Sequence, residues 1–201
     1  MPATLRPDEV RGLLEELATR FDHAGIVAGI RVVGGAALSI LDQDRRSTAD
    51  VDAVIVPTGA AADIVAELAK ERGLPDNWLN DAALAYIPPV GPEDWVEVFH
   101  RGGVSVSIGS VQMLLAMKLL ANRGVGNNDD IGFLLGACGV KSLDDARASN
   151  EGYDAQDVLS PSATARVQHW LEQRADHQPS LQVHLEATCA AYGDGWLRCG
   201  A

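Results

Sequence analysis

The chain has 201 residues, and its 28 acidic side chains outnumber its 16 basic ones, for a formal net charge of -12. This length favours one domain, or a small domain with a helical appendage, and allows a sizeable buried core. The acidity argues against a surface that binds nucleic acid by charge alone, because such surfaces are basic. A hydrophobic share of 47% and a charged share of 22% exclude a disordered or fibrous chain.

Cysteine use and hydropathy exclude further classes. The three cysteines, Cys138, Cys189 and Cys199, are widely spaced and odd in number, so neither a disulfide framework nor a zinc site is predicted. No unbroken run of about 18 apolar residues is present, and the N-terminus lacks the apolar core of a signal peptide. We therefore expect a cytoplasmic protein that does not enter a membrane.

Helix and strand signals alternate in the first part of the chain. Apolar residues at helical spacing predict a helix over 8–23, and an apolar run predicts a buried strand over 26–33. There follow a short helix over 36–41, a strand over 50–56 and a helix, capped by Thr58, that ends near residue 72. This order favours an α/β fold with a mixed sheet flanked by helices.

A hairpin and then a helical part follow the irregular segment 73–92. The turn Arg101-Gly102-Gly103 separates predicted strands over 95–100 and 104–108. Helices are predicted over 110–123, 129–139, 142–150 and 162–176, and a further helix is favoured over a strand for the last segment. We therefore expect an α/β core over 1–110 and a helical region over 111–201.

Two carboxylates open the second predicted strand. Side chains alternate along a strand, so Asp50 and Asp52 point to one face, about 6.6 Å apart along the chain. There they could share two divalent cations about 3.5 to 4 Å apart, as in phosphoryl and nucleotidyl transfer. We expect a central strand buried on both sides. The alternative for Asp-x-Asp is a solvated strand end with two exposed carboxylates.

Two further features support a site for an anion. Gly34-Gly35 lies between a strand and a helix, where unpaired backbone N–H groups can bind phosphate oxygens, although glycine pairs are often only turns. Lys118 lies within an almost wholly apolar, hence buried, helix. It must either extend its amine to solvent or face an anion, such as a phosphate or an aspartate.

Two residues have both a structural and a functional interpretation. Asp129 or Asp130 is typical of a helix N-cap and could also serve the site. Trp78 either forms a base-stacking wall of a lid or packs in the core beneath a long loop.

Together these residues resemble the nucleotidyltransferase superfamily. The match consists of Gly34-Gly35, Arg46-x-Thr48-x-Asp50-x-Asp52, Lys118-x-x-x-x-Arg123 and Asp130-Ile131. It is most similar to the AbiEii abortive-infection branch and the related MenT mycobacterial toxins, and it covers roughly residues 25 to 135.

The resemblance implies a role for each matching residue. Gly34 and Gly35 would hold the nucleotide phosphates, and Asp50 and Asp52 would bind Mg²⁺. Arg46, Thr48 and Arg123 would contact nucleotide, and Lys118 and Asp130, from the helical region, would complete the catalytic site.

One feature departs from the superfamily. Many members carry a third carboxylate on a later strand, but the predicted strand over 104–108 offers only serines. Either Asp130 supplies the missing charge, or metal binding is weakened and the protein is a degenerate relative. Glu97 is a further candidate, ranked below Asp130.

The resemblance implies a Mg²⁺-dependent enzyme that transfers a nucleoside monophosphate from an NTP to an acceptor. The acceptor could be a tRNA 3′ end, as in a toxin or phage-defence effector, and an aminoglycoside-like molecule or a protein hydroxyl stays open. The alternative is a catalytically dead module that binds a nucleotide or a partner, such as one half of a toxin and antitoxin pair.

Overall fold

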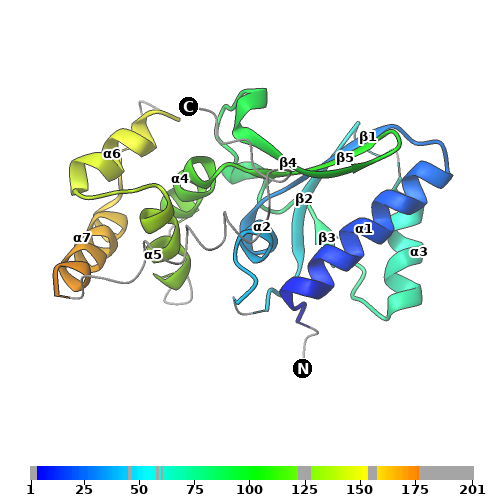
Figure 1. Cartoon of the computed structure of the whole chain (residues 1–201), viewed down its shortest axis with the longest axis horizontal. Coiled ribbons are helices and arrows are strands. Elements are labelled where there is room, and N and C mark those ends of the chain that lie inside the picture. Colours follow the sequence, from blue (N-terminus) through cyan, green and yellow to red (C-terminus); the bar gives the residue numbers. More distant parts are fainter. Residues whose placement is uncertain are drawn as a thin grey trace. The chain divides into compact units, whose positions relative to one another are not determined.

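A computed structural model of the chain describes residues 4–44, 47–57, 59, 61–121, 128–153 and 158–176 (Figure 1). The chain divides into two compact units, Met1–Met117 and Lys118–Ala201. Within the described ranges, no helix is both long and apolar enough to cross a membrane.

A five-stranded mixed sheet forms the centre of the first unit. Its strands are β1 (Ala28–Val32), β2 (Val51–Val56), β3 (Leu79–Asn80), β4 (Trp95–Arg101) and β5 (Val104–Gly109), in the spatial order β3-β2-β1-β5-β4. β1 pairs antiparallel with β2 and parallel with β5, and β4 and β5 form the predicted antiparallel hairpin. The predicted α/β fold with a mixed sheet flanked by helices is confirmed.

The two faces of this sheet differ in burial. One face is apolar and closed: Ile30, Val32, Val51, Ala53, Val104, Val106 and Ile108 are each at most 4% exposed. The opposite face is half-buried or exposed, and we call it the open face. It carries Gly29 and Arg31 of β1, Asp52, Val54 and Val56 of β2, Trp95, Glu97 and His100 of β4, and Ser105 and Ser107 of β5.

Three helices complete this unit, α1 (Pro7–His23), α2 (Gly34–Leu41) and α3 (Ala62–Arg72). α1 packs against β4, β5, α2 and α3, and α2 packs against β2. The buried stripe of α1 is the one that its helical spacing predicts, from Val10 to Phe21. α1 and α3 lie side by side (Figure 1, blue and teal).

Ion pairs join α1 to α3. Arg20 bonds both Glu16 and Glu71, and Arg72 bonds Glu16. Burial raises the pKa of the Glu16 carboxyl, but hydrogen bonds from Arg20 and Arg72 outweigh burial and hold that pKa below 4.5. The pKa of Glu16 is therefore lower in the folded than in the unfolded chain. The ion pairs stabilise the fold at a pH above the unfolded-state pKa, and this contribution is lost as the pH falls through the folded-state pKa.

Helix α4 (Val111–Ala121) contains the boundary between the two units. Its residues Met113 to Met117 are buried, as its apolar sequence predicts. The second unit contains α5 (Asn128–Ala137), α6 (Leu143–Glu151) and α7 (Pro161–Asp176). α5 lies against α7, where a Cβ added at Gly132 would be 3.1 Å from the Trp170 ring.

Several details differ from the sequence predictions. The N-cap of α3 is Ala61, because the helix begins at Ala62, and the predicted cap Thr58 lies outside the described residues. β2 is buried on one side only, since Asp52 and Val54 on its other side are half-buried. α2 begins at Gly34, two residues earlier than predicted. The predicted last helix lies beyond residue 176, outside the described residues.

Trp78 belongs to the core. Its side chain is 1% exposed, and its indole N–H donates to the carbonyl of Val65 in α3 at 3.4 Å. A ring buried in this way has no face on which a base can stack. The interpretation of Trp78 as the wall of a lid is therefore wrong.

Candidate functional site in the sheet and in the helical unit

The Gly34-Gly35 turn lies directly beside the carboxylate strand. The last pairing of β1 with β2 is the bond from the Val33 N–H to the Asp52 carbonyl, 2.9 Å, and α2 begins at the next residue. A Cβ added at Gly34, whose φ is +65°, would lie 2.5 Å from Oδ2 of Asp52. A Cβ at Gly35 would lie 2.7 Å from Oγ1 of Thr48. Only glycine allows this approach.

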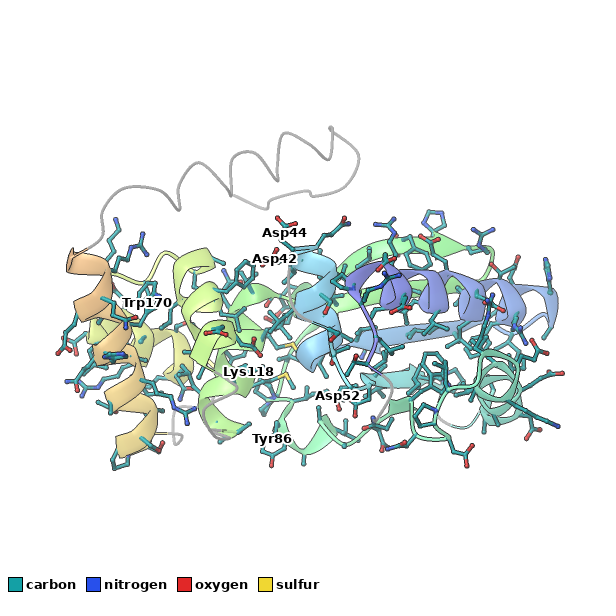
Figure 2. The ribbon with its side chains drawn as sticks, turned by 90° about the horizontal axis from the view of Figure 1, so that it is seen from below. Asp42, Asp44, Asp52, Tyr86, Lys118 and Trp170 are labelled. Carbon is teal, nitrogen blue, oxygen red and sulfur yellow. The ribbon has the colours of Figure 1, made fainter. Side chains whose placement is uncertain are left out.

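Asp52 lies near the beginning of β2, on the open face of the sheet (Figure 2), and Asp50 directly precedes that strand. Asn80 of β3 pairs with Asp52 in register, and its Nδ2 donates to Oδ2 of Asp50 at 3.0 Å. The loop before β2 is held by Thr48, whose hydroxyl donates to the Asp50 carbonyl at 3.1 Å and whose backbone pairs with Leu5. Asp50 is thus held through its side chain by Asn80 and through its backbone by Thr48.

The first turn of α2 adds backbone donors to the same place. The first N–H groups of an α-helix lack an intrahelical acceptor, and they form the positive end of the helix dipole. The N-cap residue of α2 is Val33, and its side chain makes no hydrogen bond to these N–H groups. Because Gly34 and Gly35 carry no side chain, a phosphate could approach these N–H groups beside Asp52.

We expect Gly34→Ala to reduce both stability and any activity of this site. The left-handed φ alone costs about 1–2 kcal/mol for a residue with a Cβ, and the contact with Asp52 adds to that cost and displaces the carboxylate. The matched control is Gly73→Ala, which has φ +64° but nothing within 4 Å of the added Cβ. Urea unfolding of the two variants separates strain from close approach, and equal losses of stability would contradict the packing argument.

Lys118 and Asp130 form a pair within the helical unit. Nζ of Lys118, on α4, donates to Oδ2 of Asp130, in the first turn of α5, at 2.8 Å. Their side chains are 17% and 7% exposed. Of the two alternatives for Lys118, an amine extended to solvent or one that faces an anion, the structure shows the second, with Asp130 as the anion.

The predicted site residues therefore fall into two groups. The sheet unit brings together Gly34, Gly35, Thr48, Asp50 and Asp52, and the helical unit brings together Lys118 and Asp130. Arg46 and Arg123 lie outside the described residues. That the helical region completes the site stays a prediction.

Glu97 is not placed to be the third carboxylate. It lies on β4, and β1 and β5 separate that strand from β2. Three interstrand spacings put the two backbones roughly 14 Å apart. Oε1 of Glu97 also lies 3.3 Å from Nδ1 of His100. A single metal ion cannot be shared over such a distance, so Glu97 is excluded as a ligand beside Asp52.

The residues at the start of β2 fit a Mg²⁺ ion bound together with a phosphate. Carboxylate oxygens are hard ligands of the kind that Mg²⁺ prefers. Over the described part of the chain, no three His, Cys, Asp or Glu side chains gather closely enough to hold a metal by themselves. Mg²⁺ in phosphate-transfer sites is commonly held by one or two carboxylates plus substrate phosphates, so the pair suffices for that mode.

Asn80 is a site residue that sequence reasoning missed. It orients Asp50 from a strand of only two residues, Leu79 and Asn80, which is too short for an alternating pattern. The sequence feature that could have indicated Asn80 is its polar amide side chain, in a segment whose other residues are typical of a loop. Polar side chains in loops next to an acidic pair are reasonable candidates for such positioning.

By its fold and the geometry of this site, the chain is a mixed α/β protein with an acidic pair beside a glycine turn at one end of its sheet. Among solved structures, the chain is similar to an antigenic nucleotidyltransferase-like protein from Paracoccidioides brasiliensis, with 18% identity and a TM-score of 0.44. The similarity covers 87% of this chain and 92% of that one. No protein-family model and no curated protein matches the chain. A similarity this distant says nothing about what the chain binds or catalyses.

Proposed function

We propose that the chain is a Mg²⁺-dependent nucleotidyltransferase of the AbiEii and MenT type, which transfers a nucleoside monophosphate from an NTP. The observation that carries this proposal is the close approach of Gly34 to Asp52 at the start of α2. This approach supports the proposal because N–H groups of the first turn of α2, which could bind phosphate, lie close to the Asp52 carboxylate, which could bind a metal. Neither feature alone would indicate the chemistry, whereas their combination suits a metal-bound triphosphate.

In the proposed reaction, an acceptor oxygen attacks the α-phosphorus of the NTP. A bond forms between that oxygen and the α-phosphorus, and the acceptor hydroxyl loses its proton to solvent. The bond from the α-phosphorus to the α,β-bridging oxygen breaks, and pyrophosphate leaves. Mg²⁺ would neutralise the phosphate charge and lower the pKa of the attacking hydroxyl. Asp50 and Asp52 would hold the metal, while Gly34 and Gly35 would bind phosphate oxygens through their N–H groups.

The helical unit and the acceptor belong to this proposal as well. Lys118 would bind a phosphate, with Asp130 fixing its amine, and Arg46, Thr48 and Arg123 would contact nucleotide. We propose a tRNA 3′ end as the acceptor, which would make the protein a cytoplasmic toxin or phage-defence effector, with a cognate antitoxin as a further partner. Because the net charge is -12, we expect the protein to contact only a few phosphates of the acceptor and not a long stretch of RNA duplex.

The second candidate function is a module that binds nucleotide without transferring it. One observation favours it: β5 carries Ser105 and Ser107 on the open face, where many nucleotidyltransferases have an acidic residue. Such a module could bind a toxin or antitoxin partner.

Incubation of the protein with Mg²⁺, each labelled NTP in turn and total tRNA distinguishes the two candidates. Label transfer that disappears in Asp50→Ala supports the enzyme. Nucleotide binding without transfer to any acceptor supports the module. Wild-type protein that binds none of the four NTPs would contradict both.

A further inference from the structure

Arg31 lies on the open face with its guanidinium group held against an aromatic ring. Its Cζ atom is 5.2 Å from the centroid of the Trp95 ring, although β5 lies between the two strands. This contact is a cation–π interaction, which attracts the guanidinium to the face of the ring and restricts its position. A planar fork of N–H groups of this kind suits the oxygens of a phosphate.

The sheet register places Arg31 next to the acidic pair. Arg31 pairs with Val54, and Asp52 lies two residues further along the same face. Diagonal neighbours of this kind are about 7–8 Å apart. Trp95 pairs with Gly109, level with the end of β1 where Val33 bonds Asp52, so the ring holds the guanidinium toward the carboxylate end of the sheet.

The partner of its side chain distinguishes Arg31, which lies against Trp95, from the arginines of the helices. In the helix layer, Arg6, Arg11, Arg20 and Arg72 pair with carboxylates. Among the described strand residues, Arg31 and Arg101 are the only two that are arginine or lysine. Arg101 lies at the turn of the β4–β5 hairpin and pairs with Val104, on the closed face of the sheet. Arg31 is therefore the strand cation placed beside Asp52.

We infer that Arg31 binds the β- or γ-phosphate of the nucleoside triphosphate, with Trp95 as its positioning residue. This inference rests on the proposed function. A triphosphate whose metal is held by Asp50 and Asp52 has further negative charge, and its length is comparable to the spacing between Asp52 and Arg31. The Arg31–Trp95 pair supplies a cation at that spacing, on the same face of the sheet.

The test is calorimetric titration of wild type, Arg31→Ala, Arg31→Lys and Trp95→Ala with a non-hydrolysable NTP and Mg²⁺. A lost hydrogen bond to a charged group predicts about a ten- to hundred-fold rise in Kd for Arg31→Ala. Lysine keeps the charge but not the planar fork, so Arg31→Lys retains part of the affinity. Trp95→Ala weakens binding less than Arg31→Ala, and Trp95→Phe keeps the wild-type affinity.

Two controls separate phosphate binding from a structural effect. Arg101→Ala, at the other end of β4 from Trp95, leaves the NTP affinity unchanged. The affinity for the corresponding nucleoside monophosphate stays the same in Arg31→Ala, because that ligand lacks the outer phosphates.

The possible failures are distinguishable. If wild type binds NTP and transfers label while Arg31→Ala has the same NTP affinity, the inference is overturned and the proposed function stands. The inference is also overturned if Arg31→Ala weakens only the binding of tRNA. If wild type binds no NTP at all, the proposed function fails and this inference fails with it.

Discussion

Asp52→Asn lowers the rate of label transfer by about 10²- to 10³-fold or more, the loss typical of removing one electrostatic contact to the reacting group. The amide keeps the shape of the side chain but cannot hold a cation as a carboxylate does. Because Asp52 is half-buried and lies at the start of β2, we expect little change in folding. The measurement is the initial rate of transfer at saturating Mg²⁺, with urea unfolding of the same samples.

The matched control for this variant is Asp63→Asn. Asp63 is an exposed carboxylate in the first turn of α3, within the same unit, so it reports the effect of removing one negative charge. We expect it to transfer label at the wild-type rate. Equal rates in Asp52→Asn and Asp63→Asn would contradict a metal-binding role for Asp52.

Lys118→Met destabilises the helical unit by about 3 kcal/mol. The substitution removes the charged partner of Asp130, whose side chain is 7% exposed, and breaking a buried pair from one side is costly. The chain offers Lys141, an exposed lysine in the same unit, as the control, and Lys141→Met should change the free energy of unfolding by less than about 0.5 kcal/mol.

The double variant Lys118→Met, Asp130→Leu separates stability from catalysis. Replacing both charges with apolar groups of similar size is often neutral for stability, so we expect most of the lost free energy to return. If the pair also acts on the nucleotide, the stable double variant still transfers no label. A double variant that is both stable and fully active would limit the pair to a structural role.

The periodic elements could be predicted from the sequence because their burial is periodic. The apolar stripe of α1 repeats at helical spacing, and Arg101-Gly102-Gly103 marks the β4–β5 hairpin. Alternation along β2 likewise predicts that Asp52, Val54 and Val56 share a face, whereas Asp50 precedes the strand. Each of these patterns is local, so a single sequence suffices to find it.

Features that depend on tertiary contacts could not be predicted. Asn80 reaches Asp50 from a strand too short to show a pattern, and Arg31 meets Trp95 across an intervening strand. The start of α3 could not be predicted either, because its N-cap is Ala61, whose side chain makes no capping bond. Of the two interpretations of Trp78, packing in the core beneath a long loop is confirmed, and the lid is wrong.

The most direct test of the account is a crystal structure of the protein with Mn²⁺ and a non-hydrolysable NTP, with the metal located by anomalous scattering. We expect Mn²⁺ about 2.0–2.3 Å from carboxylate oxygens of Asp50 and Asp52. We also expect phosphate oxygens within hydrogen-bond distance of the Gly34 and Gly35 N–H groups. A metal bound elsewhere, or a triphosphate away from this turn, would contradict the account.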